Sequence, residues 1–524
     1  MKPPAVAAPV DGTGPVVLDG SSLTVEDVVE VARGGRKVEV AAAAWDAVAA
    51  SRAVVDGLVE RGEVAYGITT GFGEFAHVTI RRDQVRELQR NLIMSHSVGV
   101  GEPLPRDVVR AMMVLRANAL VKGVSGVRRG LVERLLLLLN EDAVPVVPSR
   151  GSVGSSGDLA PLAHMALPII GLGKVDVGED ALVSAAEMHG RLGIEPLVLE
   201  AKEGLALING TQMMGAVTCL AVHDAGALIQ DAQIAAAMAI EALLGSVRPF
   251  DARIHALRAH PGQAAVAANL RALTRDSRIV QSHVGCSRVQ DAYSLRCTPQ
   301  VLGACRDAVA RVRDVVAVEA NSATDNPLVF PDGDIVSQGN FHGEPLALAL
   351  DALAVAVAEV ASLSERRTER MVNPDLSEGL KPFLVDAGGL NSGFMIAQYA
   401  AAALVSENKV YAHPASVDSI PTSANQEDHN SMGSVAALKL GPVLRNARCV
   451  VAIEALCAAQ ALDFKAEEGL RPGVGSAAAH DEIRRHVPRL ERDRILADDI
   501  QALDALLASG RLRQAVAAAG VDLL

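Results

Sequence analysis

The first 140 residues alternate between short helical patterns and glycine-rich loops. Between residues 22 and 60, the stretches "SSLTVEDVVEVARGG" and "AAAAWDAVAASRAVVDGLVERG" predict amphipathic helices that start near Ser or Thr and stop at Gly. The loop "YGITTGFGEFAHV" follows, and apolar residues then recur at spacings of three and four from residue 85 to about residue 140. This part of the chain therefore predicts short helices joined by structured turns.

Beyond residue 210 the helical pattern becomes longer and richer in alanine. We expect helices over residues 211–245, 298–320, 345–371, 391–411 and 433–462. Helices of this length, against an average of about 11–12 residues, are typical of a bundle in which most helix faces are buried. The pattern predicts two domains, an N-terminal one over residues 1–210 and a long-helix bundle over residues 211–524.

Composition supports a mostly α fold. Of the 524 residues 50% are hydrophobic but only 2% are aromatic, so the core must be built from Ala, Val, Leu and Ile. The apolar stretch that starts at "NGTQMMG" is interrupted by His, Asp and Gln, and lacks the roughly 20 uninterrupted apolar residues of a membrane span. It predicts a buried helix of a soluble protein.

Charge and cysteine usage narrow the function classes. The net charge is −13 and the basic residues form no dense run, so nucleic acid is not an expected partner, and neither is a membrane. The six cysteines are widely spaced without a CxxC pair, so they suggest neither a disulfide scaffold nor a zinc ribbon, and a reducing cytoplasm is the expected location.

The stretch "RGSVGSSGDLAPLAHMAL" has two interpretations. In the first, Asp158 is the N-cap of a helix and the Ser/Gly loop before it is only a turn. In the second, the loop is a reagent: the amide nitrogen of Gly157 attacks the carbonyl of Ser155, and Ser156 then loses its hydroxyl to become an alkene. The glycine permits the close approach, because it has no Cβ. The product would be an electrophile, 4-methylideneimidazol-5-one, which no ordinary side chain provides.

A series of motifs between Tyr66 and Met432 resembles the aromatic amino acid ammonia-lyase family, most closely its histidine-specific members. In chain order, the motifs are "YGITTGFG", "SVGSSGDLAPLAH", "NGTQ", "VQDAYSLRCTPQ", "TDNPL", "GNFHGE" and "SANQEDHNSM". The resemblance implies the self-made electrophile as cofactor and an ammonia-lyase or fumarase-like helical architecture. It also implies a homotetramer in which loops of different subunits complete each active site. One residue departs from the pattern, since the family usually has Ala where this chain has Ser155.

The resemblance also implies roles for individual residues. Tyr66 would be the base that removes the β-proton of the substrate, and Arg296 would clamp the substrate carboxylate. Tyr293 lies three residues before Arg296, on the same face of a helical turn, close to the electrophile. Asn209 and Gln290 would support the ring and the polar atoms of the substrate. The remaining motif positions with binding roles are Asn326, Phe341 and Gln426. Ordinary structural roles, such as an anchoring tyrosine or an intrabundle salt bridge, remain the alternative for each.

Three residues at two places in the chain point to histidine as the substrate. Ser95 and His96 stand where phenylalanine and tyrosine lyases generally have an aromatic-Leu or His-Leu pair. Glu427 adds a carboxylate that a phenyl ring would leave unpaired, whereas an imidazole can form hydrogen bonds with both His96 and Glu427.

We therefore expect deamination of L-histidine to trans-urocanate and ammonia. His164, His342, His413 and His429 lie in or near the motifs, but the sequence has no zinc-type spacing and we expect no metal or diffusible cofactor. Two alternatives stay open. One is a phenylalanine or tyrosine ammonia-lyase or aminomutase on the same scaffold, and the other is a non-catalytic helical assembly protein whose loop never cyclises.

Overall fold

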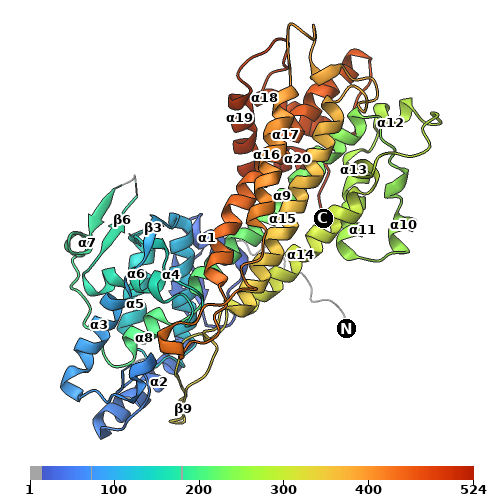
Figure 1. Ribbon diagram of the computed structural model, residues 1–524. Coiled ribbons are helices and arrows are strands. Elements are labelled where there is room, and N and C mark those ends of the chain that lie inside the picture. Colours follow the sequence, from blue (N-terminus) through green and yellow to red (C-terminus); the bar gives the residue numbers. More distant parts are fainter. Residues whose placement is uncertain (1–13, 72, 179–180) are drawn as a thin grey trace. The chain divides into compact units, whose positions relative to one another are not determined.

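The computed structural model describes residues 14–71, 73–178 and 181–524 (Figure 1). Within these ranges it has twenty α-helices and nine strands of two to four residues, so the predicted mostly α fold is confirmed. The chain forms two compact units. The first contains residues 1–220, 313–350 and 415–438, and the second contains residues 221–312, 351–414 and 439–524. The predicted division at residue 210 stays a prediction.

The first unit holds the helices of the N-terminal part of the chain and all the described strands. Its complete helices are α1 (Val25–Ala32), α2 (Ala42–Arg61), α3 (Val85–His96), α4 (Arg106–Val121), α5 (Arg129–Asn140), α6 (Leu159–Ala166), α7 (Ala185–Leu192) and α8 (Glu203–Ile208). The 3-10 turns are η1 (Gly73–His77), η2 (Arg82–Gln84), η3 (Leu167–Ile170) and η6 (Ser423–Asn425).

The strands form four small sheets. Strand β1 (Val16–Leu18) pairs in parallel with β2 (Val38–Val40), and β3 (Val100–Pro103) pairs antiparallel with β5 (Pro148–Arg150). A three-stranded antiparallel sheet has the order β4 (Val144–Pro145), β6 (Lys174–Asp176) and β7 (Leu182–Ser184). A hairpin joins β8 (Leu328–Val329) to β9 (Ile335–Val336). With so little sheet, helices must supply nearly all of the core.

The expected helix signals are partly confirmed. Helix α1 begins after Thr24, whose side chain forms a capping box with Asp27, and α2 ends at Gly62 with φ 66°. The predicted polar start of α2 is wrong, because Ala41 precedes it and forms no side-chain cap. Its amphipathic face still buries Val55 and Leu58, so packing rather than capping fixes this helix.

The second unit contains most of the long-helix bundle. The five predicted long helices are found as α9 (Gln212–Ala242), α14 (Thr298–Glu319), α15 (Glu344–Val372), α16 (Met395–Tyr411) and α17 (Gly433–Glu467), four of which begin or end in the first unit. Shorter helices accompany them, namely α10 (Ala252–Ala256), α11 (Pro261–Leu273), α12 (Arg278–Ser282), α13 (Tyr293–Arg296), α18 (Val474–His486), α19 (Leu496–Ala508) and α20 (Arg511–Ala518), with 3-10 turns η4 (Arg248–Phe250) and η5 (Pro382–Leu384).

A buried charge pair fastens two helices of this bundle. Arg367 of α15 donates twice to the carboxylate of Glu454 of α17, and all of these side-chain atoms are excluded from solvent. Ser364 donates to the same carboxylate. Because removing one partner would leave a buried charge uncompensated, this cluster fixes the register of α15 against α17.

Two helices, α9 and α15, are long and apolar enough to cross a membrane by length and composition alone. However, 72% and 67% of their most apolar windows are buried inside the protein. Such burial is what core helices show, and it matches the expectation for the stretch after Gly210.

Candidate active site

The loop Gly154–Asp158 lies between β5 and α6 and is held in a conformation that requires glycine. Gly154 and Gly157 have φ values of 72° and 73°, in the left-handed region. A Cβ on Gly157 would lie 2.0 Å from the carbonyl oxygen of Gly210, and a Cβ on Gly154 would lie 2.3 Å from Ser431 Oγ. Both positions therefore require glycine, because a side chain would clash with a neighbouring residue and because the backbone has a left-handed φ.

Segments far away in sequence hold the backbone of this loop. The N–H of Asp158 donates to the Gly210 carbonyl (2.7 Å), and Asn209 Nδ2 donates to the carbonyl of Ser156 (2.8 Å). Ser431 Oγ donates to the carbonyl of Gly154 (3.1 Å). The loop is thus fixed between the turn before α9 and the start of α17.

Asp158 occupies the predicted N-cap position of α6, but its side chain does not cap that helix. Instead Oδ2 accepts the backbone N–H groups of Met213 and Met214 (2.9 and 3.0 Å), in the first turn of α9. The predicted capping of α6 is therefore wrong, because the carboxylate satisfies the free N–H groups of a different helix. Complete burial raises the pKa of Asp158 to about 7, although these two hydrogen bonds oppose the shift.

A buried arginine supports the turn that carries Asn209. Arg116 of α4 donates from Nη1 and Nη2 to the carbonyl of Asn209 (both 3.0 Å), and it also contacts Gln212 Oε1. Burial lowers the pKa of Arg116 to about 10, while the nearby carboxylates of Asp158 and Asp325 act in the opposite direction. Arg116 therefore fixes the backbone carbonyl of Asn209, while the side-chain amide of Asn209 donates to the carbonyl of Ser156.

Glu427 faces the two serines of the loop. Ser156 Oγ donates to Oε1 (2.7 Å) and Ser155 Oγ donates to Oε2 (3.0 Å). Thr422 Oγ1 donates to Oε2 as well, across a short antiparallel bridge between Thr422 and Glu427. The carboxylate is therefore oriented by three hydroxyl groups.

His96 ends α3 and lines the same cavity. Its Nδ1 lies 2.9 Å from the carbonyl oxygen of Leu92, so this nitrogen must carry the proton and Nε2 is left as an acceptor in the neutral ring. Burial lowers the pKa of His96, and the backbone contact and Glu427 oppose this only in part. The lowered pKa favours the neutral ring, in which Nε2 is the acceptor. Ser95 donates to the carbonyl of Leu92 at 3.2 Å.

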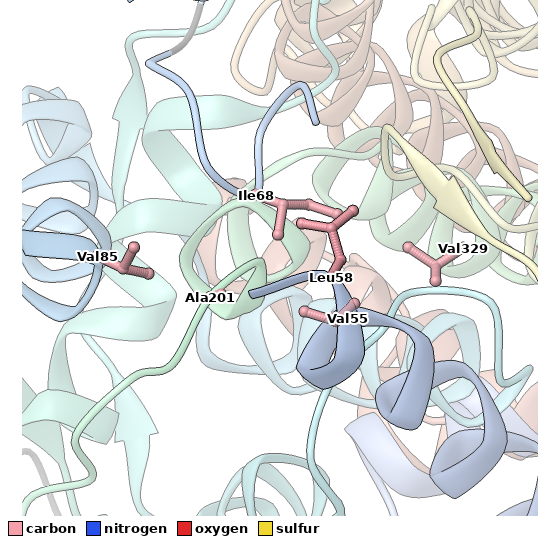
Figure 2. Close-up of a cluster of buried hydrophobic side chains, with 6 residues drawn as sticks. All are labelled: Val55, Leu58, Ile68, Val85, Ala201 and Val329. Carbon is pink, nitrogen blue, oxygen red and sulfur yellow. The ribbon is translucent and has the colours of Figure 1, made fainter. Parts of the chain in front are cut away.

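The loop that carries Tyr66 is anchored by one fully buried residue. Ile68 packs in a cluster with Val55, Leu58 and Val329, together with Val85 and Ala201 (Figure 2). Tyr66 itself is half-buried, and burial raises the pKa of its phenol. This packing fixes the backbone near Ile68, and Tyr66, two residues earlier, lines the cavity.

The first unit contains a cavity of about 1260 Å³ at this site. Ten of the residues proposed from the sequence are among its walls: Tyr66, Ser95, His96, Ser155, Ser156, Asn209, Asn326, Phe341, Gln426 and Glu427. Gly157 is buried against Gly210, behind the two serines. The cavity is large enough for an amino acid several times over.

Gln290, Tyr293 and Arg296 belong to the second unit and do not line this cavity. Arg296 Cζ lies 4.6 Å from the ring centroid of Tyr293, as expected for two residues on one helical turn. Arg296 donates to Gln290 Oε1 and to the carbonyl of Asp291, both at 3.0 Å. Gln290 and Tyr293 are exposed.

Several polar residues of the site were not predicted, among them Thr422 and Gln338. Thr422 holds the carboxylate of Glu427, and Gln338 lines the cavity while its Nε2 donates to the carbonyl of Asp325 (2.6 Å). Thr422 precedes Glu427 by five residues in a loop with no helical period. Only its place inside the motif "PTSANQED" could have suggested it.

The histidines near the motifs have other partners. His164 Nε2 accepts the N–H of Gly99 (3.0 Å), and the rings of His342 and His429 stack with centroids 5.8 Å apart. In the part of the chain that the structure describes, no three His, Cys, Asp or Glu side chains are grouped to hold a metal ion.

Comparisons with known proteins agree over nearly the whole chain. The model of the family described as "Aromatic amino acid lyase" matches residues 23–485. A histidine ammonia-lyase from Gloeobacter violaceus is 56% identical over 505 residues, covering 96% of this chain and 98% of that protein.

Solved structures show the same similarity. The crystal structure of histidine ammonia-lyase from Trypanosoma cruzi has a TM-score of 0.89 at 44% identity, and covers 96% of this chain and 95% of its own. A tyrosine aminomutase from Streptomyces globisporus has a TM-score of 0.92 at 41% identity, and covers 97% and 100%. Proteins named for histidine and for tyrosine chemistry therefore share this fold, so the cavity residues must decide the substrate.

Proposed function

Because the chain belongs to the aromatic amino acid lyase family, we propose that it is a carbon–nitrogen lyase that converts L-histidine to trans-urocanate and ammonia. The relatives named histidine ammonia-lyase, at 52–56% identity over nearly the full length, support this reaction. The helical fold, with its structural relatives, is that of this class of enzyme.

The observation that carries the choice of substrate is the carboxylate of Glu427, 2.7 Å from Ser156 Oγ and in the same cavity as His96. An imidazole N–H can donate to this carboxylate, and when the substrate ring is protonated its second N–H can donate to the neutral His96. A phenyl ring would desolvate the carboxylate and return no hydrogen bond. The site therefore favours an imidazole side chain over a phenyl group.

The loop Ser155-Ser156-Gly157 fits the formation of 4-methylideneimidazol-5-one. Gly157 has a left-handed φ and leaves no room for a Cβ, and the Ser156 side chain carries a hydroxyl that can leave. When formed, the group supplies an electrophile for the amine of the substrate. Asn209 donates to the Ser156 carbonyl, where negative charge develops when the α-proton of Ser156 leaves, so this amide stabilises the dehydration.

Tyr66 is proposed as the base for the β-proton of the substrate. Burial and the charge of Glu427 both raise the pKa of the phenol. A raised pKa favours the protonated phenol, which cannot accept a proton, so this shift taken by itself opposes the role of a base. The positively charged ammonium of a bound amino acid would act in the opposite direction. The loop of Tyr66 includes Gly67 and Gly73 with positive φ, and its closure over the substrate stays a prediction.

The second unit supplies the proposed clamp for the substrate carboxylate. Arg296 is held toward Tyr293 and Gln290 by local contacts, and the exposure of Gln290 and Tyr293 leaves them available to another chain. This supports a homotetramer in which one subunit completes the site of another. The binding roles of Asn326, Phe341 and Gln426 rest on their places in the cavity wall.

The free state of all six cysteines supports a reducing cytoplasm as the location. We keep the proposal that no metal or diffusible cofactor takes part and that neither nucleic acid nor a membrane is a partner.

The direct test offers L-histidine, L-phenylalanine and L-tyrosine separately and follows the conjugated acid by ultraviolet absorbance. Urocanate from histidine alone is expected. The similarity to a tyrosine aminomutase makes tyrosine chemistry the second candidate. Coumarate or a β-amino acid in the absence of urocanate would establish that candidate and remove histidine.

A further inference from the structure

The two carboxylate oxygens of Glu427 accept hydrogen bonds from different hydroxyl groups, and only one of these hydroxyls is lost in the proposed maturation. Oε1 accepts from Ser156, whereas Oε2 accepts from Ser155 and Thr422. Only the hydroxyl of Ser156 is lost when the proposed electrophile forms. Ser155 and Thr422 keep their hydroxyls, so Oε2 retains its donors after maturation while Oε1 loses its donor.

We propose that the carboxylate of Glu427 has a first use before the substrate contact already proposed: it protonates the hydroxyl that Ser156 loses, and only afterwards does Oε1 accept the side-chain N–H of the substrate. The second use rests on the proposed function. The first use rests on the proposed formation of 4-methylideneimidazol-5-one from this loop, and does not depend on which amino acid is the substrate.

The maturation step balances without an added reagent. The Cα–H and Cβ–Oγ bonds of Ser156 break, the Cα–Cβ double bond forms, and a proton and a hydroxide leave together as one water. Glu427 can take up the proton released from Cα and deliver it to Oγ, which lies 2.7 Å from Oε1. Glu427 gains and loses one proton, so its charge is the same before and after the dehydration. Asn209 stabilises the carbonyl of Ser156 during the same step.

Ser155 is the positioning residue of this arrangement. Its hydroxyl and that of Thr422 both hold Oε2, which directs Oε1 toward Ser156. Ser155 is also buried, so water cannot readily replace its hydrogen bond. An Ala at this position would leave Thr422 as the side-chain donor to Oε2. The departure from the family pattern thus gives this chain a second fixed donor on the carboxylate.

The first task is tested by the rate of maturation rather than by activity. The chain is made by cell-free synthesis, and its intact mass is followed with time until both waters of cyclisation and dehydration are lost. Glu427→Gln should lose the water of Ser156 at least about tenfold more slowly, since general acid–base groups commonly contribute about 10²–10⁴-fold. Asp428→Asn, which neutralises the neighbouring carboxylate, is the matched control and should mature at the wild-type rate. Equal rates for wild type and Glu427→Gln would overturn the first task.

The positioning role is tested by a double-variant cycle. Ser155→Ala should mature fully by mass, yet its kcat/KM for histidine should fall about three- to tenfold, the scale of one hydrogen bond. In the Glu427→Gln background the same change should have no further effect. Ser155→Thr, which keeps the hydroxyl, should restore activity. An equal loss in both backgrounds would show that Ser155 does not act through Glu427.

The two proposals fail separately. A wild-type chain that loses both waters but yields no urocanate would refute the proposed function and the second use of Glu427. The mass time course would still decide the first use.

Discussion

The loop Gly154–Asp158 and the segment Gln290–Arg296 both carry proposed site residues, but they are stabilised in different ways. The loop is buried and is held by Asn209, Gly210, Glu427 and Ser431, which lie more than 50 residues away in sequence. In the segment, the side chain of Arg296 bonds to Gln290 and Asp291, and Tyr293 is 70% exposed. Two longer-range hydrogen bonds reach the segment, from the N–H of Ser246 to Asp291 and from Arg367 to the carbonyl of Ser294, but they do not involve the three residues with proposed roles.

This difference shows how the work of the site is divided. The loop must hold one strained geometry in which a reagent can form, so its neighbours enforce it. The segment has only to present a cation and polar groups to a ligand or another chain. Changes in the loop should therefore show in the mass of the purified protein, whereas changes in the segment should leave the mass unaltered and act on substrate binding.

Ser156→Ala gives the largest expected effect. Without a leaving hydroxyl the chain should lose at most one water, and urocanate formation should fall by more than about 10³-fold, which corresponds to about 4 kcal/mol of barrier. Intact mass and histidine turnover measure both outcomes, and circular dichroism checks that the fold is kept. Wild-type turnover in this variant would end the proposed chemistry.

Gly157→Ala is expected to follow. The added Cβ would lie 2.0 Å from the Gly210 carbonyl at a φ of 73°, so the loop must shift, maturation should fail, and unfolding should become easier by about 1–3 kcal/mol. Gly193→Ala is the control, because Gly193 has φ 63° but open space around it. If both variants mature and unfold alike, the close contact with Gly210 is unimportant.

Arg296→Lys tests the other side of the comparison. The lysine keeps the charge but loses the two-pronged geometry, so KM for histidine should rise about tenfold or more while the mass still shows both waters lost. Steady-state kinetics and the melting temperature are the measurements. Incomplete maturation in this variant would show that Arg296 is needed for maturation, as the loop residues are.

Asp158→Asn should change the pH dependence of stability. The folded pKa of Asp158 is raised to about 7 from an ordinary value of 3.8, so the folded state binds the proton more tightly than the unfolded state. The contribution of Asp158 to stability should therefore be greatest at low pH and decline as pH rises from about 4 to about 7. Urea unfolding of both proteins at pH 5, 6 and 7.5 gives the difference. A difference that does not change with pH would show that Asp158 does not titrate in this range.

The sequence predicted the long helices to within a few residues, because an apolar period sustained over twenty or more positions is hard to mistake. It also identified Glu427 and Ser156, which the structure brings to 2.7 Å. It could not predict that the carboxylate of Asp158 would cap α9, since that pairing joins residues 55 positions apart. Arg116 was missed for the same reason, because its partners Asn209 and Gln212 lie more than 90 residues away. Thr422 lies only five residues from Glu427, but in a loop whose pattern has no helical or strand period.

The contacts that hold the loop link its conformation to three distant segments of the chain. The N–H of Gly343 and the hydroxyl of Ser431 donate to the carbonyl of Gly154, and the N–H of Asp158 donates to the carbonyl of Gly210, so the loop has all its contacts only in the folded chain. Under the proposed chemistry, cyclisation then leaves a permanent covalent record that assembly succeeded. A misfolded molecule would keep its ordinary Ser-Ser-Gly sequence, so the mass of any sample would report the fraction of chains that ever folded.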